Sequence, residues 1–253
     1  MKRIVVLSDM QIPLHNKPAV EAVIKFVKDY QPDELFCVGD EADCLAPARW
    51  SKGYAAEYSN LQADFDETTR IMKKFRNALG DYPFHVMRSN HGDRMQRYIE
   101  KYAPALSTLR DLKIEKQLKY TRELDITYHK ELWEFYDTGW VLAHGDEGPT
   151  SRYPGGTAIS LAKKLNRSVI CGHTHKLGLI PHSTSMNGKQ TSLLYGFEVG
   201  NIMDLKQATY LKGGSSNWQS GFGILYIDKK KVTPIPVPMQ NNSFVVEGKT
   251  YKW

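Results

Sequence analysis

The chain has 253 residues, of which 41% are hydrophobic and 25% charged, an ordinary composition for a globular protein that argues against a disordered or fibrous chain. Its apolar runs are only a few residues long, far below the roughly 20 that a transmembrane helix needs, so we expect no membrane partner. The net charge of +6 favours anionic partners, including nucleic acid, although the basic residues are scattered along the chain.

The first apolar run begins directly after Met1-Lys2-Arg3 and superficially resembles the start of a signal peptide. Asp9 interrupts this run before it reaches the length of a signal-peptide core. The three cysteines are an odd set without paired spacing, which predicts no disulfide framework. We therefore expect a cytoplasmic protein.

Short apolar runs typical of buried strands recur along the chain, and each ends in a cluster of Asp, Asn, His and Gly. These runs occupy residues 4–7, 35–38, 84–87, 141–143 and 168–171. Between them, apolar residues at helical spacing predict helices from Lys17 to Tyr30 and from Leu61 to Leu79, the second stopping at Gly80. Residues 93–132 read as mostly helical, and the chain from Thr191 onward reads as strands and turns.

Strands that alternate with helices predict an α/β core, and without a repeat or a linker we expect a single domain over residues 1–253. Loops at the carboxyl ends of the strands carry the functional groups of open α/β sheets, so the five clusters are expected on one rim. They offer carboxylate, carboxamide and imidazole groups from Asp9, Asp40, Asn90, His144, His173 and His175. Such mixed oxygen and nitrogen ligands suit Mn²⁺, Fe, Zn²⁺ or Ni²⁺, and six groups are about right for two cations.

Taken singly, most of these clusters have a simpler structural interpretation. Asp9 is the kind of strand-end residue that caps a helix or forms a turn, and Gly39-Asp40 alone reads as an ordinary turn. His144 fits a loop histidine with a local hydrogen bond. Two histidines one residue apart after a buried strand, as in His173-Thr174-His175, have few structural uses. The whole series in this order therefore favours a metal site.

The order of the clusters resembles the signature of the calcineurin-like metallophosphoesterase superfamily, over roughly residues 4–205. The matching segments are Asp9-Met10-Gln11, Gly39-Asp40-Glu41-Ala42-Asp43, Ser89-Asn90-His91-Gly92-Asp93, His144-Gly145-Asp146 and Gly172-His173-Thr174-His175. The resemblance implies a four-layer α/β/β/α sandwich with a binuclear metal centre at its rim. It also implies a hydrolase of phosphate esters, in which a hydroxide that bridges two divalent metal ions attacks phosphorus.

The resemblance also assigns roles to individual positions. It implies metal ligands at Asp9, Gln11, Asp40, Asn90, His144, His173 and His175. In this assignment Asp9 and His175 hold the first metal, and Asp40 bridges both. The second metal is left to Asn90, His144 and His173. His91 matches the catalytic histidine, which contacts the phosphate and helps the leaving group depart, and Asp43 would orient a ligand.

Two positions depart from the family pattern. Gln11 stands where histidine is usual. Its carboxamide oxygen is a weaker and harder donor, which favours Mn²⁺ over zinc; alternatively Gln11 does not ligate and water fills the position. Cys44-Leu45 replace the Arg-Gly of the protein Ser/Thr phosphatases, which argues against that class.

The substrate is less well defined by the sequence. We expect specificity insertions at about residues 45–60 and 95–140, which carry the aromatic residues Trp50, Tyr54, Tyr58, Tyr98, Tyr102, Trp133 and Tyr136. These could stack a nucleobase, form the core of a helical cap, or make a dimer interface, and the oligomeric state stays open. Arg88, Arg94 and Arg152 are candidate phosphate contacts.

Basic charge together with aromatic loops favours a phosphodiesterase that acts on nucleotide or nucleic-acid diesters, for instance cyclic nucleotides. The first alternative is a phosphomonoesterase acting on small phosphates or phosphoprotein. An alternative of another class is a non-catalytic binding protein on the same fold, in which Gln11 marks a disabled site. The presence of His91 and of every expected ligand but one argues for an enzyme.

Overall fold

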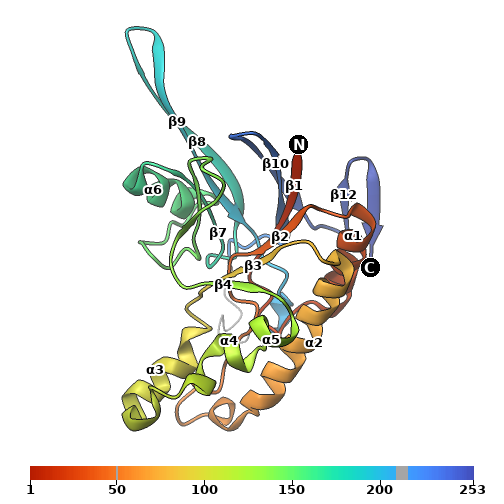
Figure 1. Cartoon of the computed structure of the whole chain (residues 1–253), viewed down its shortest axis with the longest axis vertical. Helices are drawn as coiled ribbons and strands as arrows, with labels where there is room; N and C mark the ends of the chain where they lie inside the picture. Colours follow the sequence, from red (N-terminus) through yellow and green to blue (C-terminus); the bar gives the residue numbers. More distant parts are fainter. Residues whose placement is uncertain (50, 209–215) are drawn as a thin grey trace.

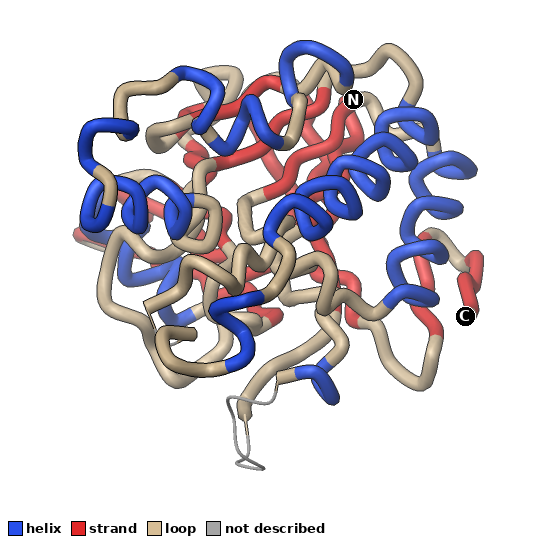
Figure 2. Tube along the Cα trace, turned by 90° about the horizontal axis from the view of Figure 1, so that it is seen from below, coloured by secondary structure: helices blue, strands red, loops and turns tan. Residues whose placement is uncertain are grey.

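The computed structural model describes residues 1–49, 51–208 and 216–253, so Trp50 lies outside the described residues. Two β-sheets face each other in the interior, and helices lie at the periphery (Figures 1 and 2). The helices are α1 (Lys17–Tyr30), α2 (Leu61–Leu79), α3 (Asp93–Tyr102), α4 (Ile114–Gln117), α5 (Tyr120–Glu123) and α6 (Gly156–Leu165). Within the described residues no helix combines the length and the apolar character needed to cross a membrane.

The first sheet has the strand order β11-β10-β1-β2-β3-β4. Its strands are β1 (Lys2–Leu7), β2 (Glu34–Cys37), β3 (Phe84–Met87), β4 (Thr127–His129), β10 (Gly221–Asp228) and β11 (Lys231–Pro238). Strands β1 to β4 run parallel, whereas β10 pairs antiparallel with β1. The carboxyl ends of β1, β2 and β3 therefore meet at one edge of the sheet.

The second sheet has the order β5-β6-β7-β9-β8, in which β6, β7 and β9 run parallel. Its strands are β5 (Trp133–Glu134), β6 (Trp140–Leu142), β7 (Ser168–Cys171), β8 (Leu177–Met186) and β9 (Lys189–Val199). The hairpin of β8 and β9 projects away from the body of the molecule (Figure 1). A separate two-stranded hairpin, β12 (Ser243–Val246) and β13 (Lys249–Lys252), lies near the C-terminus.

Three hydrophobic cores separate four layers, and β1 shows how one strand serves two of them. Successive side chains of a strand point to opposite faces. Val5 and Leu7 accordingly join the core beneath α1 and α2, whereas Ile4 and Val6 join the core between the two sheets. A third core packs α6 on the outer face of the second sheet. The predicted four-layer α/β/β/α sandwich is confirmed, and its continuous apolar strands follow because both faces are covered.

The two long helices begin and end where the sequence predicts. The Asn16 side chain accepts a hydrogen bond of 3.2 Å from the Ala19 backbone N–H at the start of α1, and Asn60 caps α2 in the same way at 3.1 Å. Gly80 ends α2 with a positive φ of 73°, a conformation that glycine adopts without steric cost. In the described residues after Thr191 the predicted strands and turns are also confirmed.

The mostly helical interpretation of residues 93–132 is wrong at its end. Residues 127–129 form strand β4, which pairs parallel with β3. The strand arises because Thr127, Tyr128 and His129 extend the edge of an existing sheet, a tertiary contact that leaves no periodic pattern in three residues.

Candidate metal centre

Five loops meet at one rim of the sandwich, and backbone hydrogen bonds fix their relative positions. In the first sheet the Asp9 N–H donates to Gly39 O at 3.1 Å, and the Gln11 N–H donates to Asp40 O at 2.8 Å. In the second sheet the Gly172 N–H donates to His144 O at 2.9 Å. The predicted convergence of strand ends is therefore present, with loops from both sheets.

The backbone of these loops is held in an uncommon conformation. Asp9, Gln11, Asp40, His173 and His175 all have positive φ, between 49° and 66°. This left-handed region costs non-glycine residues free energy, and such residues cluster at functional sites. The packing is equally tight, because a Cβ at Gly39 would lie 2.7 Å from both His144 Nδ1 and Ser89 Cβ.

One group of donors lies around the Asn90 carboxamide. Its Oδ1 lies 2.7 Å from His144 Nε2 and 3.0 Å from His173 Nδ1. Asp40, His144 and His173 each offer a ligand atom within 4.8 Å of the other two. These are the residues that the resemblance assigns to the second metal, together with the predicted bridging carboxylate. The structure brings them together; their binding of a metal stays a prediction.

His144 is fully buried and its ring is oriented by the protein. Its Nδ1 lies 2.8 Å from the carbonyl oxygen of Val38, which can only accept a hydrogen bond. The ring therefore carries a proton on Nδ1 and points Nε2 at Asp40 and Asn90. Orientation of an imidazole by a backbone carbonyl is the usual arrangement for a metal-binding histidine.

A second group of donors lies around His175. Its Nε2 lies 3.5 Å from Asp9 Oδ1 and 3.1 Å from Gln11 Nε2. The other oxygen of Asp9 accepts hydrogen bonds from the Ser8 hydroxyl and, at 2.9 Å, from the His173 N–H. Asp9 therefore presents only Oδ1 to the site. Gln11 lies beside His175, and metal binding by its carboxamide oxygen stays a prediction.

The electrostatics of the site favour an additional positive charge. Burial opposes ionisation of Asp40, but the nearby rings of His144 and His91 outweigh burial and hold the pKa of Asp40 well below its usual value. Burial likewise opposes protonation of His144, but Asp40 outweighs it and raises the pKa of His144 to about 10. A metal ion would supply the positive charge that the proton supplies to this pair.

Several predicted ligands have buried polar atoms that lack a hydrogen-bond partner and are therefore available to bind metal ions. Among the described residues, the buried side-chain atoms without a hydrogen-bond partner include Asp9 Oδ1, Gln11 Oε1, Asp40 Oδ2 and His175 Nδ1. A buried polar atom left unpaired costs about 1–3 kcal/mol. The three oxygens belong to predicted ligands, so the donor set fits two hard or borderline divalent cations.

His91 lies at the edge of the donor groups, between the Asp43 carboxylate and the Arg94 guanidinium. Its Nδ1 lies 3.1 Å from Asp43 Oδ1, and its backbone N–H donates to Asp40 Oδ1 at 3.2 Å. Its Nε2 lies 2.7 Å from an Arg94 nitrogen, and the same guanidinium donates to the Asp43 carbonyl oxygen at 2.6 Å. Asp43 thus contacts the predicted catalytic histidine; its orientation of a metal ligand stays a prediction.

The structure adds neighbours that sequence reasoning missed. Glu147 accepts hydrogen bonds from the backbone N–H groups of His144 and Gly145, at 3.0 and 2.7 Å. Trp218 stacks on His175, with ring centroids 4.3 Å apart. Glu147 lies three residues after a predicted ligand and was accessible to motif reasoning. Trp218 is distant from His175 in the sequence, and no motif identifies it as a neighbour of the site. Among the suggested arginines, Arg88 instead pairs with Asp93 and Asp146.

A family model for calcineurin-like phosphoesterases matches residues 2–177. The chain belongs to the calcineurin-like phosphoesterase family. This phosphoesterase is 39% identical over 259 residues to the Gene 54 protein of Mycobacterium phage D29, with 99% of each chain covered. It is 36% identical over 258 residues to the Gene 54 protein of Mycobacterium phage L5, again with 99% of each covered.

Solved structures similar to this phosphoesterase include Vps29 of Entamoeba histolytica, crystallised with zinc. That structure aligns with a TM-score of 0.48 and 14% identity, covering 99% of this chain and 98% of Vps29. The protein TT1561 of Thermus thermophilus aligns with a TM-score of 0.39 and 13% identity, covering 93% and 98% of the two chains.

Proposed function

We propose that this phosphoesterase is a two-metal phosphodiesterase that hydrolyses nucleotide or nucleic-acid diesters and uses Mn²⁺. The observation that carries the proposal is the set of donors that converges at the rim. The donors around His175 and the donors around Asn90 lie next to each other, because the Gln11 N–H donates to Asp40 O and the His173 N–H donates to Asp9 Oδ2.

Two divalent cations in such a site activate a water molecule and stabilise the charge of the phosphoryl oxygens. Asp9, Asp40 and His175 would hold one of them, and Asp40, Asn90, His144 and His173 the other. The carboxamide oxygen of Gln11 is harder than imidazole nitrogen, which supports Mn²⁺ over zinc.

In this proposal His91 would protonate the leaving group. Asp43 Oδ1 lies 3.1 Å from Nδ1, so Nε2 is the atom that would exchange a proton with the leaving group. Arg94 borders the same atom at 2.7 Å, and its planar fork matches the oxygens of a phosphate. A substrate phosphate near His91 would therefore compete for the Arg94 guanidinium and release Nε2.

The proposed preference for diesters rests on the space next to the site. A diester carries a second esterified group that must be accommodated beside the metals. A pocket of about 690 Å³, lined in part by Asn90 and Arg94, adjoins the donor groups. The second esterified group of a diester would occupy this pocket, which a small phosphomonoester would leave empty.

The test compares two esters on metal-stripped protein reloaded with Mn²⁺, with metal binding followed separately by calorimetry. Bis-p-nitrophenyl phosphate should be cleaved faster than p-nitrophenyl phosphate. His91→Ala should reduce turnover by about 10²–10⁴-fold, the usual contribution of a general acid, while metal still binds. His182→Ala in the β8–β9 hairpin is the matched control.

Faster cleavage of the monoester would replace the proposal with the phosphomonoesterase alternative. Metal binding without turnover of either ester, with Mn²⁺, Ni²⁺, Zn²⁺ or Fe²⁺, would replace it with a non-catalytic binding protein.

A further inference from the structure

The pocket beside the metal centre lies between residues 46–49, 52 and 57 on one side and helix α3 on the other. Its volume of about 690 Å³ is within the range of roughly 300–1,000 Å³ that ligand sites occupy. Asn90 and Arg94 line it, and both also contact the predicted catalytic or metal-binding residues. The pocket therefore borders the predicted metal centre.

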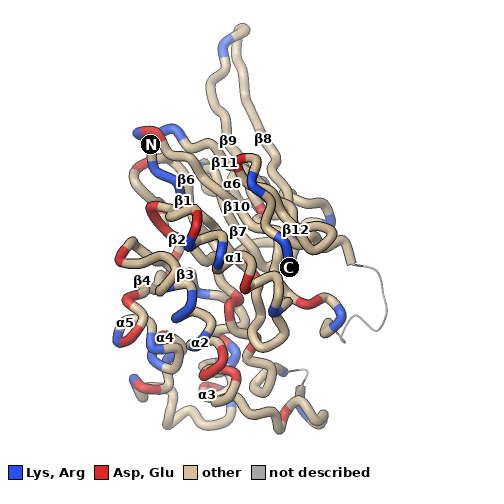
Figure 3. Tube along the Cα trace, turned by 90° about the vertical axis from the view of Figure 1, so that its right-hand side faces the viewer, with Lys and Arg blue, Asp and Glu red and all other residues tan. Residues whose placement is uncertain are grey.

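The charge of the pocket is strongly one-sided. Among the described residues, its lining includes the cations Arg49, Lys52, Arg94, Arg97 and Lys101, and one acid, Glu57. Elsewhere, basic and acidic residues are interspersed along the chain (Figure 3). Glu57 accepts a hydrogen bond of 2.7 Å from the Gly53 N–H, which commits this carboxylate to its own loop. Two of the cations also have acidic neighbours, since Arg97 lies 3.2 Å from Asp93 and Arg94 lies 3.5 Å from Asp43. The lining still carries more cations than acids, which favours an anionic ligand.

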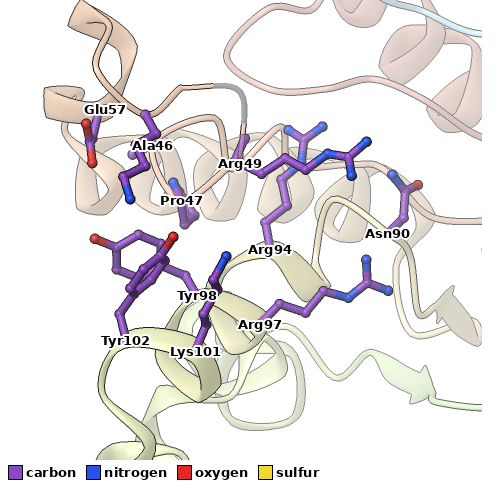
Figure 4. Close-up of a pocket in the computed structure, with 12 residues that line it drawn as sticks. Ala46, Pro47, Arg49, Glu57, Asn90, Arg94, Arg97, Tyr98, Lys101 and Tyr102 are labelled. Atoms are coloured by element: carbon purple, nitrogen blue, oxygen red, sulfur yellow. The ribbon is translucent and has the colours of Figure 1, made fainter.

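The pocket has two different ends (Figure 4). Arg49, Arg94 and Arg97 extend on the side of Asn90, whereas Tyr98 and Tyr102 lie at the opposite end. The ring centroids of the two tyrosines are 4.8 Å apart. Their side chains belong to residues that are 42% and 48% exposed, so the rings are open to a ligand rather than buried in a core.

Two lysines flank the aromatic end. Lys52 Nζ lies 5.3 Å from the Tyr102 ring centroid, and Lys101 Nζ lies 5.2 Å from it. The lysines come from the two different walls of the pocket. Aromatic rings interleaved with cations are the arrangement that binds single-stranded nucleic acid, in which bases stack on the rings and phosphates meet the cations.

We propose that this pocket binds the single-stranded nucleic acid that flanks the scissile diester. The arginines would bind the phosphate next to the metal centre, the tyrosines would stack a base, and the lysines would bind a more distant phosphate. A cyclic mononucleotide has one phosphate, which the metals would occupy, and would leave the distant cations without a partner. The placement of the scissile phosphate rests on the proposed function; the binding of the strand does not.

The test measures binding of a fluorescent oligothymidylate by anisotropy, in EDTA so that hydrolysis cannot occur. The double variant Arg97→Ala/Lys101→Ala should bind about tenfold more weakly, and the slope of log affinity against log salt should fall by about 1.4, or 0.7 for each lost phosphate contact. The matched control, Lys163→Ala/Lys164→Ala, removes two exposed cations from helix α6 and should leave both values unchanged.

The aromatic part has its own comparison. Tyr98→Ala/Tyr102→Ala should weaken binding, whereas Tyr98→Phe/Tyr102→Phe should preserve it, because phenylalanine keeps the stacking surface. Circular dichroism of each variant reports whether helix α3 is retained.

Three results would overturn the inference: an unchanged salt slope in the Arg97/Lys101 variant, equal weakening by the α6 control, or equally tight binding of inorganic polyphosphate of matched charge. Strand binding without hydrolysis of any ester would overturn the proposed phosphodiesterase activity, but the inference that the pocket binds a single strand would stand. Hydrolysis of bis-p-nitrophenyl phosphate without strand binding would overturn the pocket and leave the phosphodiesterase.

Discussion

A pair of histidines that are not among the predicted metal ligands should make the stability of this protein sensitive to mild acid. His85 on β3 and His129 on β4 share a hydrogen bond of 3.0 Å. Trp133 stacks on both rings, with centroid distances of 4.6 and 4.2 Å. Burial, followed by the charges of Arg76 and Lys2, lowers the pKa of His85 to about 4. Burial and then His85 lower the pKa of His129 to about 4.

The direction in which pH changes the free energy of unfolding follows from proton uptake. In the unfolded chain a histidine binds its proton near pH 6.5, whereas the folded pair binds near pH 4. Between these values the unfolded state holds more protons, so the free energy of unfolding falls as pH falls, by up to about 1.4 kcal/mol per pH unit for each histidine. The rings are partly solvated and share one hydrogen bond, and Glu34 lies 3.9 Å from His85, so we expect a total loss of about 2–3 kcal/mol.

Urea unfolding of the metal-free protein across this pH range measures the effect. The variant His85→Asn/His129→Gln cannot titrate there and should lose about 2 kcal/mol less stability than the wild type between pH 6.5 and pH 4. His182→Asn, in the projecting hairpin, should follow the wild type. Parallel curves for the double variant and the wild type would refute the reasoning, whatever the variant's stability at neutral pH.

Three further substitutions test the site and its support. Gln11→His should raise the affinity for Zn²⁺ relative to Mn²⁺ by about tenfold in calorimetry, since imidazole is the softer donor; an unchanged ratio would mean that residue 11 is not a ligand. Gly172→Ala places a Cβ 1.7 Å from Ser8 Oγ and 2.5 Å from Asp9 Oδ2, so it should displace Asp9 and weaken metal binding by about 10–100-fold, whereas Gly148→Ala, with nothing within 4 Å, should not. Glu198→Ala removes the acceptor of the Gly155 and Thr157 N–H groups and should cost about 3 kcal/mol in urea unfolding, with Glu198→Gln milder.

The sequence was most informative where local patterns and tertiary position coincide. The strand-end clusters are recognisable because parallel strands bring their carboxyl ends to one edge, so Asp9, Asp40 and Asn90 were predicted neighbours despite their separation along the chain. The bounds of α1 and α2 followed from apolar spacing and from a terminal Gly80. These features require no knowledge of contacts between distant segments.

Other features depend on such contacts and were not predictable. The stacking of Trp218 on His175 joins segments 43 residues apart, and no spacing rule links them. Trp133 belongs to the predicted specificity segment but packs against His85 and His129. In the same segment Tyr136 donates its hydroxyl hydrogen bond to the buried Glu34. Specificity at residues 45–60 and 95–140, the single domain and the cytoplasmic location stay predictions.

The division of the donors between the two sheets has a mechanical consequence. Asp9, Asp40 and Asn90 follow strands of the first sheet, and the three histidines follow strands of the second. Each metal would therefore be bound by residues of both sheets and would link the two sheets at this edge of the sandwich. Packing of the two sheets and binding of the metals would then be coupled equilibria. A substitution that weakens the core between the sheets, for example at Phe36 or Phe197, would therefore lower metal affinity without touching a ligand.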